Sequence, residues 1–171
     1  EFVRENYPRG MPEDIARDVM KQILDSINYL HKLNIRHRDI KPQNFLVFET
    51  EPSIKIVLAD FGFAKQYSLD EKGTEYIGTE LFAPPEIHLH KPYDNSVDIW
   101  PIGITLFFIL TSRSPYRTCS ERAAYIEKII KGALNYRLLK MRKISIEAIN
   151  IIKKMCKVDP ANRLTAEALL N

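Results

Sequence analysis

The stretch His37-Arg38-Asp39-Ile40-Lys41-Pro42-Gln43-Asn44 decides how this 171-residue chain is interpreted. Within it, Asp39 offers a carboxylate, Lys41 an amine and Asn44 a carboxamide. A second group, Asp60-Phe61-Gly62, begins sixteen residues after the last of these. Moving a phosphoryl group from a nucleotide to a hydroxyl needs a carboxylate to orient the hydroxyl, a cation beside the phosphate and oxygen ligands for Mg²⁺. The polar side chains of the two groups are the right set for that chemistry.

Neither group is decisive alone, since an isolated Asp-Phe-Gly is usually a turn and a lone His-Arg-Asp means little. Their order and spacing together make coincidence improbable. At this point the sequence resembles the eukaryotic protein kinase family, and the resemblance covers nearly the whole chain. It implies that Asp39 is the catalytic base, that Asn44 and Asp60 hold Mg²⁺, and that Lys41 contacts the γ-phosphate of ATP.

The resemblance also assigns roles outside the two groups. Leu46 matches the residue under the adenine ring of ATP, and a place in the hydrophobic core is compatible with that role. The segment from Gly78 to Glu86 resembles the stretch where the peptide substrate docks. Asp98 matches the aspartate that supports the backbone of the catalytic loop, at the start of a buried central helix. Arg163 matches an arginine that forms a buried ion pair with the residue at the Glu86 position. Loss of one partner would leave an unpaired buried charge and would strongly destabilise the fold.

The class of substrate follows from two positions. A lysine two residues after the base, followed by Pro42, resembles the serine/threonine kinases and not the tyrosine kinases. The resemblance also places the hydroxyl of Thr79 beside Asp39 and Lys41. Transfer of the γ-phosphate of ATP to serine or threonine hydroxyls of proteins is therefore the expected reaction.

Arg38 suggests how the conformation of the long loop, residues 60–86, is controlled. In relatives with an arginine before the base, this residue usually receives a phosphate from that loop. By resemblance, His37 and Arg38 also give structural support to the site. Glu75 lies four residues before Thr79, where many relatives carry the phosphorylated threonine. Our hypothesis is that Glu75 supplies a standing negative charge to Arg38, although one charge is less than a phosphate carries. An exposed loop glutamate without that role is the alternative. Residues of the loop that could accept phosphate are Ser68, Thr74 and Tyr76.

Several positions depart from the usual family pattern. Phe82 and Pro84 stand where tyrosine and alanine are usual, which casts little doubt on catalysis. Pro101 replaces a serine, and proline inside a helix removes a backbone hydrogen bond and favours a kink unless it lies near the helix start. Gln43 replaces the glutamate of many kinases that prefer arginine-rich peptides, so no basic substrate is implied.

The composition is that of an ordinary soluble globular domain. Apolar residues make up 45% and charged residues 27% of the chain, and the net charge is +3. A nucleic-acid partner would need basic residues gathered on one face, and the sequence shows no basic run. The most apolar stretch, Ile102 to Leu110, is too short to span a bilayer. Two cysteines, Cys119 and Cys156, suggest neither a metal site nor a disulfide framework, and the second fits a buried core thiol.

Hydrophobic periodicity predicts a mainly helical fold. Helices are expected from Pro12 to about His31, from Asn95 to about Leu110, and over the ranges 121–131 and 145–157, with a last one capped by Thr165. The apolar runs Phe45 to Phe48 and Ile54 to Leu58 predict a short β-hairpin. The range 60–86 is expected to be long and irregular.

The resemblance therefore implies that residues 1–171 are the C-terminal lobe of a protein kinase, a helical bundle around a buried central helix with a hairpin beside the catalytic loop. A glycine-rich loop, a phosphate-pairing lysine and its partner glutamate are missing from this sequence. We expect the N-terminal lobe to be a required partner, this piece alone to be inactive, and the protein to be cytoplasmic or nuclear. A pseudokinase scaffold is the alternative, and it would usually lack Asp39, Asn44 or Asp60. Binding of nucleic acid has only the weak positive charge in its favour.

Overall fold

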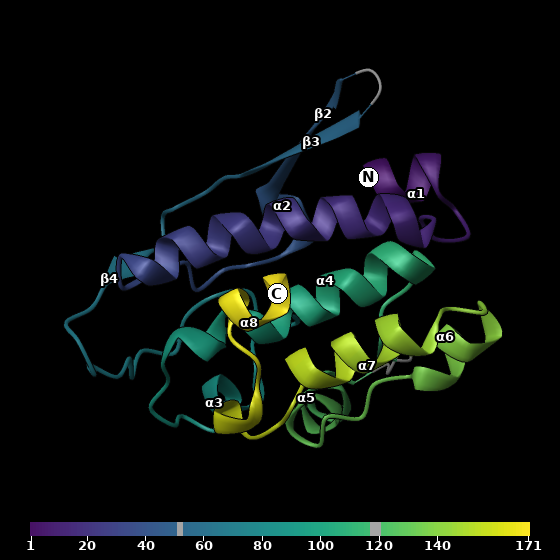
Figure 1. Ribbon diagram of the computed structural model, residues 1–171. Coiled ribbons are helices and arrows are strands. Elements are labelled where there is room, and N and C mark those ends of the chain that lie inside the picture. Colours follow the sequence, from purple (N-terminus) through teal and green to yellow (C-terminus); the bar gives the residue numbers. More distant parts are fainter. Residues whose placement is uncertain (51–52, 117–120) are drawn as a thin grey trace.

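The computed structural model describes residues 1–50, 53–116 and 121–171, so Cys119 lies outside the described residues. Figure 1 shows a layered arrangement in which the long helix α2 crosses above α4 and α7, and a β-hairpin projects on the far side of α2. The elements in chain order are α1 (Phe2–Asn6), α2 (Glu13–Lys32), β1 (Ile35–Arg36), η1 (Pro42–Asn44), β2 (Phe45–Thr50), β3 (Ser53–Leu58), β4 (Lys65–Gln66), α3 (Pro85–His88), η2 (Asn95–Val97), α4 (Ile99–Thr111), α5 (Arg122–Ile130), α6 (Tyr136–Met141), α7 (Ile146–Met155), η3 (Pro160–Asn162) and α8 (Ala166–Leu170). The fold is mainly helical, as the sequence predicts, and it contains two small sheets, of which the β2–β3 hairpin was predicted.

The central helix α4 is buried along almost its whole length. Trp100, Ile102 and Phe107 are fully buried, and the helix packs between α2 and α7. Gly103 is required at a close approach, because an added Cβ would lie 2.5 Å from Sγ of Cys156 on the segment after α7. The predicted buried central helix is therefore confirmed.

The start of α4 differs from the prediction in one detail. A short 3-10 turn, η2, is capped by Asp94, whose carboxylate accepts a hydrogen bond from Ser96 N at 3.0 Å. The α-helix itself begins at Ile99, so Pro101 lies in its first turn. The first four N–H groups of an α-helix have no partner within the helix, so Pro101 costs α4 no hydrogen bond.

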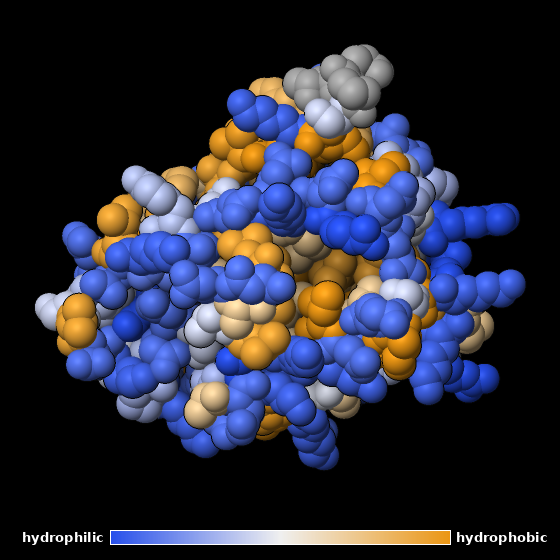
Figure 2. All heavy atoms as spheres, viewed as in Figure 1, coloured by the Kyte–Doolittle hydropathy of each residue, from blue (hydrophilic) through white to orange (hydrophobic). Residues whose placement is uncertain are grey.

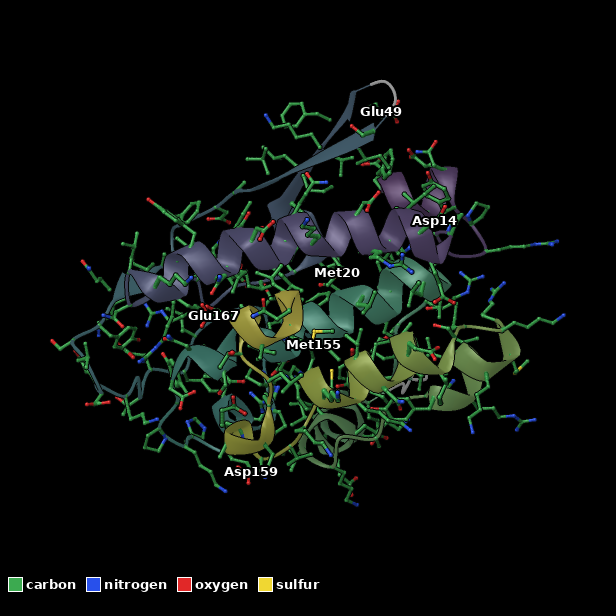
Figure 3. All side chains as sticks on the ribbon, in the orientation of Figure 1. Asp14, Met20, Glu49, Met155, Asp159 and Glu167 are labelled. Atoms are coloured by element: carbon green, nitrogen blue, oxygen red, sulfur yellow. The ribbon has the colours of Figure 1, made fainter. Side chains whose placement is uncertain are left out.

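Helix α2 forms one wall of the core. Its buried residues recur at three- and four-residue steps, and their apolar face packs on α4, α8 and β3. Figure 3 shows Met20 on α2 and Met155 on α7 in the space between these helices. A hollow of about 440 Å³ lies between α2, α4, α7 and α8, and Figure 2 shows its largely apolar lining.

The hairpin formed by β2 and β3 is antiparallel, and it extends two residues beyond the predicted first strand. Phe45 pairs with Leu58 on the buried face, whereas Leu46 pairs with Val57 on the outer face. Gln22 of α2 fastens the hairpin, because its amide donates to Ile54 O and accepts from Ile56 N, each at 2.9 Å. These two hydrogen bonds fix the position of the hairpin, and with it Leu46, relative to the helical layers.

Short elements were not predicted from the sequence. These are α1, α3, α6 and a second two-stranded sheet in which β1 pairs with β4. Each has at most six residues, too few for a periodic pattern to be recognised. Apart from β4 and the start of α3, the range 60–86 is irregular, as expected.

Cys156 is buried in the core, as predicted, and burial raises the pKa of its thiol to about 12. The apolar stretch of α4 belongs to this same core. Within the described ranges, none of the helices has both the length and the apolarity that crossing a membrane requires.

Candidate functional site

Asp39 is the centre of a compact hydrogen-bonded cluster. Its side chain is almost completely buried, and its Oδ2 accepts a hydrogen bond from Lys41 Nζ at 2.7 Å. Its Oδ1 accepts from Thr79, both from the hydroxyl at 2.6 Å and from the backbone N–H at 2.8 Å. Lys41 Nζ also donates to the Thr79 hydroxyl at 2.7 Å, which closes a triangle of three side chains. Sequence reasoning placed these three residues together, and the structure has them in contact.

The charge state of Asp39 follows from these contacts. Burial opposes ionisation of its carboxyl, but the hydrogen bonds from Lys41 and Thr79 outweigh burial and lower the pKa below its usual value. The carboxylate is therefore ionised at neutral pH and can accept a further hydrogen bond.

Asn44 approaches the same carboxylate from η1. Its Nδ2 donates to Asp39 O at 2.8 Å and to Asp39 Oδ2 at 3.2 Å. The amide nitrogen of Asn44 is therefore directed at Asp39. The backbone O of Asn44 accepts from Ala59 N at 2.8 Å, which brings the residue before Asp60 to the catalytic loop.

Asp60 follows β3 in a left-handed backbone conformation with φ of 60°. Its side chain is exposed, and Gly62 N donates to its Oδ1 at 3.3 Å. A carboxylate and a carboxamide oxygen on adjoining segments are the hard oxygen ligands that Mg²⁺ prefers. The donor set of Asn44 and Asp60 therefore fits a magnesium ion.

The backbone of the catalytic loop rests on Asp98, which is fully buried. His37 N donates to its Oδ2 at 2.9 Å, and Arg38 N donates to its Oδ1 at 2.8 Å. His31 of α2 contacts the same carboxylate at 3.0 Å. Burial opposes ionisation of Asp98, but the hydrogen bond with His31 and the two backbone N–H groups lower its pKa. Asp98 thus holds the strained Arg38, whose φ is 67°.

His37 links the catalytic loop to the Asp60 segment. Its ring nitrogen Nε2 lies 3.1 Å from Ala59 O, and its ring meets Phe61 edge-on at 5.1 Å between centroids. The ring contact holds the two loops together beside Asp39. The roles of His31 and Phe61 were not predicted, because nothing in the sequence shows which segment each ring faces.

Glu86 and Arg163 form the buried ion pair that the sequence predicts. Nη1 of Arg163 lies 2.5 Å from Oε1 of Glu86, and Nη2 lies 2.6 Å from Oε2. Arg163 also donates to Ser96 O at 3.0 Å and Lys157 O at 2.8 Å. The pair therefore joins the segment after Thr79 to the start of α4 and to the C-terminal part of the chain.

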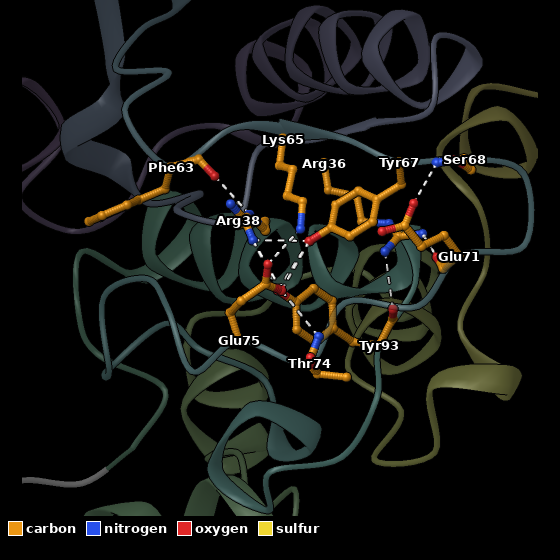
Figure 4. Close-up of polar contacts among 10 residues, drawn as sticks. All are labelled: Arg36, Arg38, Phe63, Lys65, Tyr67, Ser68, Glu71, Thr74, Glu75 and Tyr93. Carbon is orange, nitrogen blue, oxygen red and sulfur yellow. Dashed lines mark hydrogen bonds and ion pairs between the residues drawn. The ribbon is translucent and has the colours of Figure 1, made fainter.

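Glu75 lies in the middle of a second polar network (Figure 4). Its carboxylate accepts from Lys65 Nζ at 2.7 Å and from Tyr93 Oη at 3.2 Å, and it lies 3.5 Å from Nη1 of Arg38. The hydroxyl of Tyr67 completes the group at 3.4 Å. The hydrogen bond from Lys65, followed by backbone N–H groups, lowers the pKa of Glu75 far below its usual value. The predicted proximity of Glu75 and Arg38 is thus present.

Arg36 was not recognised in the sequence, yet it anchors the neighbouring loop. It donates to Tyr93 O at 3.2 Å and to Glu71 O at 2.6 Å, and its guanidinium lies 3.8 Å from the ring centroid of Tyr67. Its third hydrogen bond goes to Asn95 Oδ1 at 3.0 Å. A buried arginine two residues before Arg38 gave no signal in the sequence, since its partners are mostly backbone carbonyls.

Leu46 lies apart from the Asp39 cluster, on the outer face of the hairpin. It is 48% exposed and its cross-strand partner is Val57. Phe61, beside the same loop region, is 49% exposed. Leu46 therefore lies at the surface and not in the hydrophobic core.

Comparison with known proteins decides the family. The family model of the protein kinase domain matches residues 2–171. The chain belongs to the protein kinase family. This kinase chain is 34% identical over 156 residues to Serine/threonine-protein kinase H1 of Homo sapiens, across 88% of this chain and 36% of that protein. It is 35% identical over 161 residues to Calcium/calmodulin-dependent protein kinase cmkA of Emericella nidulans, across 92% of this chain and 38% of that protein.

A third relative is Probable serine/threonine-protein kinase fhkD of Dictyostelium discoideum, 33% identical over 172 residues, which covers 93% of this chain and 23% of that protein. The kinase chain therefore spans at most about two fifths of the length of these curated relatives. The resemblance to the eukaryotic protein kinase catalytic domain is confirmed by these matches.

Proposed function

We propose that this kinase chain is the C-terminal lobe of an active serine/threonine protein kinase. The observation that carries the proposal is the cluster in which Lys41, Thr79 and Asn44 all bond to the buried carboxylate of Asp39. An ionised carboxylate held in this way, next to a cation, is the arrangement that phosphoryl transfer to a hydroxyl needs. The relatives named above as serine/threonine kinases support the same reaction.

Asp39 would accept a hydrogen bond from the substrate hydroxyl and fix its direction of attack. As the hydroxyl oxygen forms a bond to the γ-phosphorus of ATP, the bond from that phosphorus to the β–γ bridging oxygen breaks. The hydroxyl proton passes to the Asp39 carboxylate, and ADP is the leaving group. Lys41, held 2.7 Å from Asp39, would steady the transferring phosphoryl group. When bound at Asn44 and Asp60, Mg²⁺ would neutralise charge on the phosphate oxygens.

Serine or threonine is the proposed acceptor. Lys41 reaches both Asp39 and Thr79, and it is followed by Pro42, a pattern that resembles serine/threonine kinases. The Thr79 hydroxyl bridges the base and the lysine from the segment where we propose that the peptide docks.

A second lobe would complete the ATP site. The outer face of the hairpin exposes Leu46, Phe48 and Val57, which are 48%, 50% and 37% exposed. We propose that Leu46 contacts the adenine ring and that an N-terminal lobe covers this apolar face. On this proposal residues 1–171 alone have no kinase activity. We further propose a cytoplasmic or nuclear location, to which the free, buried thiol of Cys156 is suited.

Glu75 is proposed to act as a fixed charge that orders the loop. Two cations and two tyrosine hydroxyls surround its carboxylate, and one of the cations is Arg38, next to the catalytic base. Because this charge is always present, activity would not require a phosphate on the loop.

The test is transfer from ATP by the full-length protein in the presence of Mg²⁺, with a library of serine- and threonine-containing peptides. We expect Asp39→Asn to lower kcat by about a hundredfold or more while the fold is kept. Asp18→Asn, which removes an exposed carboxylate of α2, is the matched control. A wild-type protein without activity would count against catalysis and favour a scaffold. An Asp39→Asn variant with full activity would exclude Asp39 as the catalytic base.

A further inference from the structure

Basic residues are unevenly distributed along the chain. Residues 113–157 hold 12 Lys or Arg and three Asp or Glu, although the whole chain has a net charge of only +3. No acidic residue occurs between Glu127 and Glu147. Four of these cations, Arg137, Lys140, Arg142 and Lys143, lie on helix α6 and the corner that follows it.

The helical geometry of α6 explains this gathering. Arg137, Lys140 and Met141 are three and four residues apart, so they share one face of the helix. Leu139 points the other way and is fully buried. The next two residues are the half-buried Arg142, which ends α6, and the exposed Lys143 in the corner before α7. We call the surface formed by Arg137, Lys140, Met141, Arg142, Lys143 and Ile146 the α6 basic patch.

The charges of the patch are uncompensated. Some cations elsewhere are paired, as Arg122 is with Glu80 at 2.8 Å and Lys131 with Glu127. Among the residues that the structure describes, the four cations of the patch have no carboxylate within ion-pair distance. A concentration of unpaired positive charge favours a negatively charged partner.

Exposed apolar side chains distinguish between the anionic partners. Met141 is 70% exposed and Ile146 is 56% exposed, both beside the cations. The phosphate backbone of a nucleic acid offers no apolar surface on which such side chains could be buried. The boundary between lipid headgroups and acyl chains does, and burial of apolar surface there favours binding. Single-stranded nucleic acids also favour exposed aromatic rings, and Tyr136 of α6 is only partly exposed, with Lys153 over its ring at 5.5 Å.

The patch is presented on a rigid corner at the edge of the molecule. Figure 1 shows α6 at the opposite end from β4, and Figure 2 shows long hydrophilic side chains projecting along that edge. The left-handed Lys143, with φ of 59°, turns the chain toward α7. Ser145, which caps α7, bonds to Glu13 of α2 through N at 2.8 Å. The corner therefore keeps its shape without a partner.

We propose that the α6 basic patch docks this protein on an anionic lipid membrane. Its cations contact the acidic headgroups, while Met141 and Ile146 enter the interface. The chain lies on the membrane surface and does not cross it. The proposal is independent of kinase activity, because no residue of the patch belongs to the Asp39 cluster.

The test is binding of the full-length protein to phosphatidylcholine vesicles with and without phosphatidylserine. Each Lys or Arg near an anionic surface raises affinity about fivefold, so we expect Lys140→Gln with Lys143→Gln to lower affinity for the anionic vesicles about 25-fold. The matched control, Lys21→Gln with Lys55→Gln, removes equal charge from exposed positions on α2 and β3 and is expected to bind nearly as well as the wild type. Met141→Gln separates lipid from other anions, since it is expected to weaken vesicle binding several-fold without weakening binding to duplex DNA.

Preferential binding to the phosphatidylserine vesicles, lost in the patch variants and kept in the control, supports the proposal. Absence of vesicle binding would overturn it, as would equal losses in patch and control variants. Tighter binding to duplex DNA than to the vesicles, insensitive to Met141→Gln, would also overturn it and assign the surface to nucleic acid.

Discussion

Glu86 and Arg163 lie 77 residues apart in sequence and meet as a buried ion pair with two parallel hydrogen bonds. Both side chains are nearly inaccessible to water, at 2% and 0% exposure. The remaining donors of Arg163 bond to the backbone oxygens of Lys157 and Ser96. This pair holds the end of the segment after Thr79 against the helical core.

Loss of one partner of this pair is expected to destabilise the fold strongly. Arg163→Met leaves the Glu86 carboxylate buried without a cation, which costs about 3–5 kcal/mol of unfolding free energy. Urea denaturation of the full-length protein measures the loss. The double variant Glu86→Leu with Arg163→Met removes both charges, and it should recover much of the stability. A single variant as stable as the wild type would show that the pair is unimportant.

Replacing Thr79 by alanine is expected to impair catalysis more than binding of ATP. The substitution removes the hydroxyl that bonds to both Asp39 and Lys41, and hydrogen bonds to charged groups are the stronger ones. We expect kcat to fall about ten- to a hundredfold. Thr79→Ser keeps the hydroxyl and should restore most of the rate. Thr74→Ala, in the same loop, is the matched control, and an equal loss there would contradict the role of the Thr79 hydroxyl.

Glu75→Ala tests whether a fixed charge orders the loop. The change leaves Arg38 and Lys65 without their shared carboxylate. Because each partly exposed ion pair contributes little free energy, we expect kcat to fall only about three- to tenfold. Glu71→Ala, whose carboxylate bonds to Ser68 N, controls for loss of a nearby charge. Phosphatase treatment should leave the wild-type rate unchanged. Unchanged turnover of Glu75→Ala would exclude the proposed role.

Asp94 is expected to make the free energy of unfolding depend on pH in the acidic range. Burial opposes ionisation, but hydrogen bonds from Lys72 and Ser96 lower its pKa from 3.8 to about 2. Because the pKa is lower in the folded state, the stabilisation is complete above about pH 4 and is lost as pH falls toward 2. Because Lys72 and Asp94 are both roughly half exposed, we expect their ion pair to contribute about 1 kcal/mol to the free energy of unfolding.

The measurement for Asp94 is the difference in unfolding free energy between wild type and Asp94→Asn at several pH values. That difference should shrink between pH 4 and pH 2. Asp70→Asn, an exposed loop carboxylate where asparagine tolerates the positive φ of 64°, is the control. A difference that stays constant with pH would contradict the assignment.

Local sequence determined the main helices, the hairpin and the four polar residues from Asp39 to Asp60. Helices such as α2 and α4 could be predicted because a repeat of apolar residues over several turns is visible in the sequence. The pairing of Arg163 with Glu86 was predicted only through resemblance to a family, since a salt bridge across 77 residues leaves no local pattern. The short elements α1, α6 and β4 stayed unpredicted because their neighbours, more than their own residues, stabilise them.

What only the tertiary structure decided is which side chains meet. Resemblance to relatives suggested only that Glu75 faces Arg38, whereas the fold also surrounds its carboxylate with Lys65, Tyr67 and Tyr93. Likewise, Arg137 and Lys140 share one exposed face only because α6 is helical, and the corner after it adds the exposed Lys143. The physical reason is the same in both cases, since electrostatic and hydrogen-bond energies depend on distance in space and not on separation along the chain.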